Sequence, residues 1–386
     1  MSIFRCLLNI AVNRKINILT HEFSPKKGGA GIYVEEIAKG AVESGFDVTV
    51  WAPESSRIVE GGIPHELEYL PLKGSHDWTC RLKLLNTIRM NRNCFEGSIL
   101  HFAEAGVISG MMYYKGLRKL NYERLILTFH GSEILRYSKL PHRKALLNKL
   151  IEKADQVTVL SSYVGELLVK HFKKAEPKLL LTPGAPRELG NTDSPDMLLD
   201  KAEGDIVLLT VARVHPRKGQ LDVIRAIGGM SSDVKSRLIY WVVGQKVNDE
   251  YAQDLLSTAG KLEVRTKFFT DVDDCDLQYY YQTADVFIMT SVPYERSIEG
   301  FGLTYMEASS FGLPVIAHDI GGVSSAVIKN ETGLLISPKD IDALQRAIER
   351  LCRDELLRKE FGKKGKLYAA QFKWSDSAQA TYSSFE

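Results

Sequence analysis

The sequence predicts an α/β protein made of two doubly wound domains, each a parallel sheet covered by helices. Short apolar runs rich in Val, Ile and Leu alternate with longer amphipathic stretches along the whole chain, which is typical of parallel sheets buried on both faces. The length of 386 residues favours two domains over a single core. A polar segment near the middle separates two series of strands, as an interdomain linker does.

Each series contains six strand candidates. In the first half they are Ile16–Leu19, Val48–Ala52, Ile99–Phe102, Leu125–Phe129, Val157–Leu160 and Leu179–Leu181. In the second half they are Ile206–Val211, Leu238–Val243, Val264–Phe269, Val286–Met289, Val315–Ala317 and Leu334–Ile336. Residues 185–205 between them carry Pro, Gly, Asn and Asp and few large apolar side chains, so we interpret them as the linker. This division predicts an N-terminal domain over residues 1–184 and a C-terminal domain over residues 206–367.

Composition excludes several classes of protein. With 44% hydrophobic and 25% charged residues the chain is an ordinary globular protein, and no apolar run approaches the roughly 20 residues of a membrane span. Residues 1–12 are too short and too interrupted for a targeting segment, so we read them as an extension before the first strand. The five cysteines include no C-x-x-C pair and indicate free thiols in a reducing compartment. We expect no nucleic-acid partner.

A glycine-rich turn follows the first strand. Gly28, Gly29 and Gly31 stand directly before a helical pattern, where backbone amides can face an anion or a polar oxygen. Val34 stands where a dinucleotide-binding loop needs a third small residue, so the turn is not such a fingerprint. A plain tight turn explains this stretch equally well.

Two further candidates stand at ends of buried strands. His130 ends one strand just before a helix whose first turn contains Glu133, and ligands of doubly wound sheets bind at such ends. A structural histidine is the alternative. Arg213 and Lys218 flank the turn after the first strand of the second half. Fixed cations are what a leaving diphosphate needs, although a solvated basic loop fits as well.

The most specific segment lies between two carboxylates eight residues apart, Glu299 and Glu307. The loop that follows Glu299 consists of Gly300, Phe301, Gly302 and Leu303. Carboxylates accept paired hydrogen bonds from sugar hydroxyls, and amides at a helix start face a diphosphate. If the eight residues were helical they would span roughly 12 Å, comparable to the distance from a hexose to a nucleotide's ribose.

This segment and the preceding Arg213-x-x-x-x-Lys218-Gly loop resemble those of the retaining GT-B glycosyltransferases, the glycogen- and sucrose-synthase-like group also described as glycosyltransferase family 4-like. The resemblance covers nearly the whole chain. It implies the GT-B fold, in which two Rossmann-like domains face each other across a cleft. The N-terminal domain would take the acceptor and the C-terminal domain the nucleotide sugar. A C-terminal helix over residues 368–386 would pack back on the N-terminal domain.

The resemblance also implies a role for each candidate residue. Glu299 would contact the transferred sugar and Glu307 the ribose, while Arg213 and Lys218 bind the diphosphate. The residues implied to act in catalysis are His130, Arg213, Lys218 and Glu299. The residues implied to bind the donor are Gly29, Arg213, Lys218, Glu299, Gly300, Phe301, Gly302, Leu303 and Glu307.

The implied reaction moves a sugar, with retention of configuration, from a UDP- or GDP-sugar to a hydroxyl of a glycan, a lipid-linked or a small-molecule acceptor. Such enzymes serve polysaccharide biosynthesis in the cytoplasm and need no cofactor beyond the donor. Two alternatives stay open. One is a non-catalytic GT-B partner in a glycosylation complex, which the intact charged residues oppose, because buried charges without a ligand are costly. The other is a sugar-nucleotide epimerase or a phosphorylase.

Two acidic triplets match the D-x-D pattern of metal-dependent transferases, Asp271–Asp273 and Asp274–Asp276. Both stand where a loop leads into a helix, so helix capping and compensation of the helix dipole explain them better. We therefore predict no metal site.

The first half of the chain is basic. Nine Lys or Arg lie between residues 115 and 149, and residues 134–147 mix cations with large apolar side chains, as helices on membrane surfaces do. Peripheral contact with the anionic inner surface of a membrane is one hypothesis. We favour an amphipathic helix packed on its own sheet, because Pro141 interrupts the periodicity.

Overall fold

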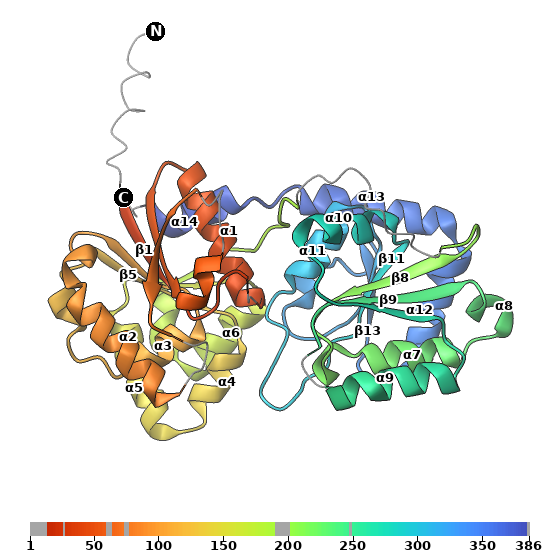
Figure 1. The fold of residues 1–386 in the computed structure, drawn as a ribbon, viewed down its shortest axis with the longest axis horizontal. Coiled ribbons are helices and arrows are strands. Elements are labelled where there is room, and N and C mark those ends of the chain that lie inside the picture. Colours follow the sequence, from red (N-terminus) through yellow and green to blue (C-terminus); the bar gives the residue numbers. More distant parts are fainter. Residues whose placement is uncertain are drawn as a thin grey trace, which may run out of the picture. The chain divides into compact units, whose positions relative to one another are not determined.

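The computed structural model describes residues 14–25, 28–58, 64–72, 77–189, 201–246 and 249–383. The chain forms two compact units (Figure 1): unit 1 comprises Met1–Gly184 and Lys373–Glu386, and unit 2 comprises Ala185–Phe372. Each unit contains one parallel sheet with helices around it, which confirms the predicted α/β class. The N-terminal extension, including Cys6, and residues 190–200 of the expected linker lie outside the described residues.

The sheet of unit 1 has the strand order β3-β2-β1-β4-β5-β6-β7, and all of its pairings are parallel. Its strands are β1 (Lys15–Leu19), β2 (Asp47–Pro53), β3 (Glu66–Leu70), β4 (Ile99–Phe102), β5 (Arg124–Phe129), β6 (Gln156–Val159) and β7 (Leu179–Leu181). The sequence predicted all of them except β3. That strand lies at the sheet edge and exposes Glu66 and Glu68, so it has no continuous apolar run.

The helices of unit 1 are α1 (Gly29–Glu43), α2 (Trp78–Met90), α3 (Ala105–Met111), α4 (Ser132–Ser138), α5 (Pro141–Lys153), α6 (Ser162–His171) and α14 (Trp374–Tyr382). Helices α1 and α14 lie side by side (Figure 1), and a Cβ on Gly40 would come within 2.5 Å of the Trp374 carbonyl. The single helix predicted over residues 368–386 is wrong in its start. Helix α13 ends at Ala369 and the segment that joins unit 1 begins at Lys373, because α13 packs on α11 of unit 2 whereas α14 packs on α1.

The sheet of unit 2 has the order β10-β9-β8-β11-β12-β13 and is also parallel. Its strands are β8 (Ile206–Val211), β9 (Leu238–Val243), β10 (Thr266–Phe269), β11 (Val286–Met289), β12 (Val315–His318) and β13 (Gly333–Ile336). Its helices are α7 (Gln220–Gly228), α8 (Ser232–Lys235), α9 (Asp249–Lys261), α10 (Asp274–Thr283), α11 (Leu303–Ser310), α12 (Ile341–Arg353) and α13 (Glu355–Ala369). All six strands match the prediction to within two residues at either end.

Short 3-10 turns connect these elements: η1 (Glu54–Ile58), η2 (Arg92–Phe95), η3 (Leu117–Leu120), η4 (Lys173–Lys178), η5 (Pro216–Lys218) and η6 (Val323–Ser325). In unit 2, α7 packs against both α9 and α12, while α11 packs against α13. Every residue of β8 and of β9 is buried. The apolar core of each unit therefore lies between its sheet and its helices, and polar side chains gather where the strands end.

Two other expectations concern the chain as a whole. Cys80, Cys94, Cys275 and Cys352 form no disulfide within the described part of the chain. Among the described residues, no helix has the length and apolar character needed to span a membrane.

Candidate active site

Glu299 of unit 2 lies at the centre of a cluster of cations. Its Oε2 accepts hydrogen bonds from Lys218 Nζ at 2.8 Å, Arg217 Nη1 at 3.0 Å and Ser291 Oγ at 3.0 Å. Arg217 and Lys218 lie in η5, which follows β8, and Ser291 lies just beyond β11. Because β8 and β11 are neighbouring parallel strands, the fold brings these groups together at the carboxyl edge of the sheet, where ligands of doubly wound folds bind.

The electrostatics of this cluster favour an ionised carboxylate. Burial alone would raise the pKa of Glu299, but the charges of Lys218 and Arg217, with hydrogen bonds from Lys218 and Ser291, lower it to about 2. Burial and the neighbouring Arg217 lower the pKa of Lys218, against the opposing effect of Glu299. Two cations thus face one carboxylate, so the cluster carries a net positive charge that suits an anionic ligand.

Glycines shape the two loops at this edge. Gly219, directly after Lys218, has φ = 72°, and a Cβ there would lie 1.9 Å from the Thr290 carbonyl oxygen. Gly302 precedes α11 with φ = 87°, and a Cβ there would lie 2.4 Å from the Tyr305 ring. Both positions combine a left-handed backbone with no space for a side chain, so glycine is required.

The expected helix between the two glutamates is shorter than predicted. Helix α11 begins at Leu303, so Glu299 lies in the loop before it and the span of roughly 12 Å does not apply. Gly302 is the residue before the helix, Phe301 and Leu303 are buried, and Gly300 is half-buried. The left-handed backbone of Gly302 directs the chain from the loop into α11. The segment from Glu299 to Glu307 is therefore not one continuous helix.

Glu307, in the middle of α11, is fully buried and takes part in an ion pair that the sequence did not predict. Its Oε1 lies 2.6 Å from Arg187 Nε, and its Oε2 accepts a hydrogen bond from Tyr281 at 2.9 Å. Arg187 also pairs with Asp274 at 2.8 Å. Burial and the charge of Glu307 raise the pKa of Tyr281 well above its ordinary value. A carboxylate offers about four acceptor positions, so some remain for a ligand on either oxygen.

Arg213 belongs to the same loop as Lys218 but not to the Glu299 cluster. Its side chain is exposed, and its carbonyl accepts a hydrogen bond from Gln220 at 3.0 Å. The described residues provide no ion pair for this guanidinium. It therefore contributes positive charge near the cluster without being neutralised by the protein.

His130 and Gly29 belong to unit 1. His130 follows β5, and its Nε2 lies 2.9 Å from the Ala103 carbonyl oxygen, at the end of the neighbouring β4. Its backbone amide donates to Glu133 in the first turn of α4, and its ring packs edge-on against Tyr33 of α1 with the centroids 5.2 Å apart. Gly29 is the exposed first residue of α1. Gly29 thus begins α1, and His130 lies next to α1 at the carboxyl end of β5, where the sequence predicted it.

Glu104 adds a charged group to this edge of unit 1. It is buried, and its carboxylate accepts hydrogen bonds from the His21 ring at 3.0 Å and from the Val107 amide at 2.8 Å. Burial would raise the pKa of Glu104, but His21 and the amides of Gly106 and Val107 lower it to about 2. Glu104 therefore caps α3 as a carboxylate and fixes the loop that His130 contacts.

The acidic triplets cap a helix. Asp273 is the N-cap of α10, and its side chain accepts a hydrogen bond from the Asp276 amide at 2.7 Å. Asp274, in the first turn, pairs with Arg187. In the described ranges, no three or more His, Cys, Asp or Glu side chains form a group that could hold a metal ion. Metal independence itself stays a prediction.

Sequence reasoning missed several members of these clusters. Arg187 stands in the segment interpreted as the linker, and Tyr281 carries no local signal of a site; both reach Glu307 through the tertiary fold. Ser291 lies two residues after a predicted strand, and Arg217 lies within the predicted loop of Arg213 and Lys218, next to Lys218. Glu104 could have been found from its position just after the β4 run.

Comparisons with known proteins identify the families that the two halves of the chain match. The family described as Glycosyl transferases group 1 matches residues 198–368, and the one described as Glycosyltransferase Family 4 matches residues 27–183. A GDP-mannose-dependent alpha-(1-6)-phosphatidylinositol monomannoside mannosyltransferase of Mycolicibacterium smegmatis is 27% identical over 91% of this chain and 93% of its own. A D-inositol 3-phosphate glycosyltransferase of Corynebacterium diphtheriae is 26% identical over 91% of this chain and 88% of its own.

Solved structures share the fold. Sucrose-phosphate synthase from Thermosynechococcus elongatus superimposes with a TM-score of 0.76 at 22% identity, covering 95% of this chain and 96% of the other. Anabaena HepE in complex with UDP-glucose gives 0.74 at 19% identity, covering 95% and 97%.

The two parallel sheets are those of the GT-B fold. The two family matches together cover most of the chain. The chain belongs to the group 1 glycosyltransferases, with a family 4 N-terminal domain, and is a transferase.

Proposed function

We propose that this glycosyltransferase moves a hexose from a UDP- or GDP-sugar to a hydroxyl of a phosphate-bearing acceptor, with retention of the anomeric configuration and without a metal. The observation that carries the proposal is the Glu299 cluster, in which Lys218 and Arg217 meet at a glycine loop before α11. The names of the two relatives contain phosphate-bearing molecules, a phosphatidylinositol monomannoside and an inositol 3-phosphate. GDP-mannose is therefore the first donor to test.

The residues of unit 2 would act mainly by position and charge. Negative charge grows on the diphosphate as the sugar bond breaks, and preorganised cations stabilise that charge. Lys218 and Arg213, which has no ion pair among the described residues, would supply this positive charge. The amides of Gly302 and Leu303 would donate hydrogen bonds to the diphosphate. Glu299 would accept hydrogen bonds from hydroxyls of the sugar, and Glu307 from the ribose. The outgoing diphosphate would deprotonate the acceptor hydroxyl on the same face, which gives retention.

Unit 1 would take the acceptor. His130, Glu104 and the first turn of α1 at Gly29 lie at the carboxyl edge of its sheet. His130 would bind a polar atom of the sugar or of the acceptor, since its ring is half-buried rather than enclosed. We expect the enzyme to work in the cytoplasm.

The test is a transfer assay with a panel of UDP- and GDP-sugars against D-inositol 3-phosphate and phosphatidylinositol, with the anomeric configuration of the product read by NMR. We expect transfer from one donor class, an unchanged configuration and full activity in EDTA. An inverted product would refute retention. Complete loss in EDTA with recovery on adding manganese would refute metal independence and return attention to Asp271–Asp276.

A further inference from the structure

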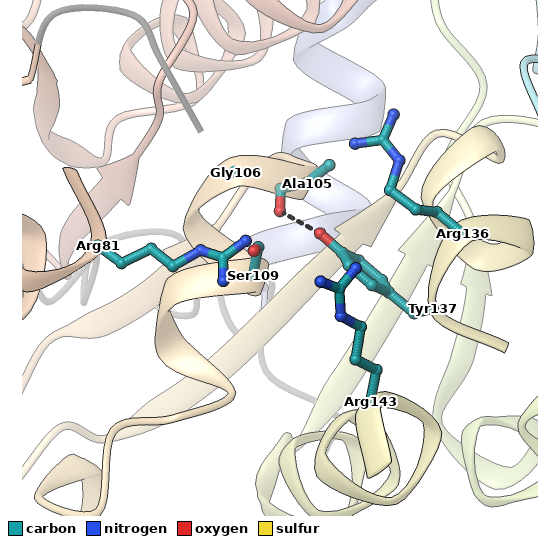
Figure 2. Close-up of a pocket in the computed structure, with 7 residues that line it drawn as sticks. All are labelled: Arg81, Ala105, Gly106, Ser109, Arg136, Tyr137 and Arg143. Carbon is teal, nitrogen blue, oxygen red and sulfur yellow. Dashed lines mark hydrogen bonds between the residues drawn. The ribbon is translucent and has the colours of Figure 1, made fainter. Parts of the chain in front are cut away.

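A small hollow in unit 1 is lined by three arginines that come from three different helices. Figure 2 shows Arg81 of α2, Arg136 of α4 and Arg143 of α5 around the hollow, with Ser109 and Tyr137 between them. Arg81 and Arg143 point toward the Tyr137 hydroxyl, which donates a hydrogen bond to the Ala105 carbonyl at 3.0 Å. Three helices thus converge on one small polar space.

The three guanidinium groups lack partners among the described residues, in which none of them forms an ion pair or a hydrogen bond. The Nε of Arg81 is buried without an acceptor, and its guanidinium lies 5.8 Å above the Tyr113 ring. The nearby carboxylates form no ion pair with these arginines among the described residues. Glu104 is used by His21 and the first amides of α3, and Glu133 by the amides of His130 and Gly131.

A cluster of cations without direct ion pairs favours an anion. Arginine binds phosphoryl oxygens through two parallel N–H groups, so several guanidinium groups can share one phosphate. The hollow has a volume of about 40 Å³. Pockets for whole small ligands run from about 300 to 1,000 Å³. The size therefore fits one charged group of a larger molecule.

The position of the hollow connects it to the proposed acceptor side. The loop after β4 carries the Ala103 carbonyl that His130 contacts and the Ala105 carbonyl that Tyr137 contacts. A ligand with a phosphoryl group in the hollow would therefore extend along this loop toward His130. The carboxyl edge of a parallel sheet is where such ligands lie.

We propose that Arg81, Arg136 and Arg143 bind the phosphoryl group of the acceptor, either of a soluble phosphate ester or of a phospholipid headgroup. This inference rests on the proposed function in its assignment of the acceptor to unit 1. Binding of a phosphoryl group can be measured without any transfer, so the two can fail separately.

The experiment measures binding of three probes by the full chain: inorganic phosphate, D-inositol 3-phosphate and vesicles containing phosphatidylinositol, with unphosphorylated inositol for comparison. The variants Arg81→Ala and Arg143→Ala should weaken binding of the phosphorylated probes about 10- to 100-fold, the loss of one charge-assisted contact. Arg143→Lys should lose less, since it keeps the charge but not the fork. Lys144→Ala removes a neighbouring charge of α5 outside the hollow and should change binding less than about twofold.

Melting temperatures within about 2 °C of the unaltered chain would show that these variants fold. Binding of D-inositol 3-phosphate supports a soluble source, and binding of vesicles alone supports a headgroup. Equal losses in Arg143→Ala and Lys144→Ala, equal binding of inositol and its phosphate, or no arginine-dependent binding of any probe would overturn the inference.

Transfer assays separate this inference from the proposed function. Transfer that is equally fast in Arg143→Ala and in the unaltered chain would refute the phosphoryl site and leave the function standing. Absence of transfer from every donor, together with arginine-dependent phosphate binding, would refute the function and leave the phosphoryl site standing.

Discussion

The buried pair of Arg187 and Glu307 should contribute strongly to the stability of unit 2, apart from any role in binding. The side chains are only 6% and 1% exposed, and 2.6 Å separates Nε from Oε1. Removing one member of a buried pair leaves an uncompensated charge and costs about 3–5 kcal/mol. The two single variants should therefore destabilise unit 2, and by different amounts.

The partners that each variant leaves in place determine which of the two variants loses more stability. In Glu307→Ala, Arg187 keeps Asp274, whose side chain is half exposed, so we expect about 3 kcal/mol. In Arg187→Met, the Tyr281 hydroxyl is the one side-chain partner that Glu307 keeps among the described residues, so we expect about 5 kcal/mol. A domain of this size loses about 2–4 °C per kcal/mol, which gives about 6–12 °C and 10–20 °C. The double variant Arg187→Met/Glu307→Leu should approach the unaltered chain, since apolar replacements of buried pairs are often neutral.

Differential scanning calorimetry of the full chain measures this, with Glu331→Ala as a control that removes an exposed carboxylate from the same unit. Calorimetric titration with GDP and UDP, well below the lowest melting temperature, then measures binding. If Glu307 holds the ribose, Glu307→Ala should weaken both nucleotides by about 1.5–3 kcal/mol, or roughly 10- to 150-fold. Melting shifts under 2 °C in both single variants, or a double variant whose loss is the sum of the two, would refute the buried pair. Unchanged nucleotide binding by a folded Glu307→Ala would remove Glu307 from the ribose.

The other predictions concern charge. Glu299→Ala should slow transfer sharply while free GDP or UDP binds as tightly as before or more tightly, because Lys218 and Arg217 lose their counter-ion; weaker binding of the free nucleotide by calorimetry would contradict this. The pKa of Glu104 lies at about 2 in the folded chain against 4.5 ordinarily, so its stabilisation is complete above pH 4.5 and lost as the pH falls toward about 2. Urea unfolding at pH 6 and pH 3 should show Glu104→Gln losing less stability on acidification than the unaltered chain, by about 2 kcal/mol, and equal losses in both chains would contradict this. If the chain binds membranes, it should sediment with anionic but not neutral vesicles, and release should follow high salt or neutralisation of Arg136, Lys139, Arg143 and Lys144. Equal recovery in the supernatant with both vesicle types would exclude that contact.

Most of the fold could be predicted from apolar runs, because buried parallel strands carry their signal on consecutive residues. Strand β3 could not, since Glu66 and Glu68 alternate with its inward side chains at an exposed edge. The resemblance implied one helix over residues 368–386, and the break before α14 could not be found from the sequence because no proline or glycine marks it. The break at residues 370–373 exists because the two flanking helices pack on different units.

The site residues also divide into those that the sequence predicts and those that only the tertiary fold brings together. Glu299 and Lys218 could be found from the sequence because each lies in a loop with a glycine: Gly219 directly follows Lys218, Gly302 lies three residues after Glu299, and both glycines have a left-handed backbone. Arg187 reaches Glu307 across 120 residues, and Arg81 lies well before the basic stretch of residues 115–149 that drew attention to α4 and α5. No local pattern records such convergence, because it depends on which helices the sheet brings together.

Glu299 and Glu307 lie in different electrostatic surroundings. Glu299 pairs with Lys218 and Arg217. A diphosphate that binds there competes for the same two cations, so donor binding must change the charge distribution around Glu299. Glu307 pairs with Arg187 and Tyr281, neither of which comes from the loop of Lys218, so that pair can persist while the donor binds. A chain that lost Glu299 would leave Lys218 and Arg217 without their buried counter-ion, so it would lose stability and turnover but keep its affinity for the free nucleotide. A chain that lost Glu307 would lose stability together with that affinity. Binding of the free nucleotide, kept in one variant and weakened in the other, is therefore the property by which the roles of the two carboxylates can be told apart.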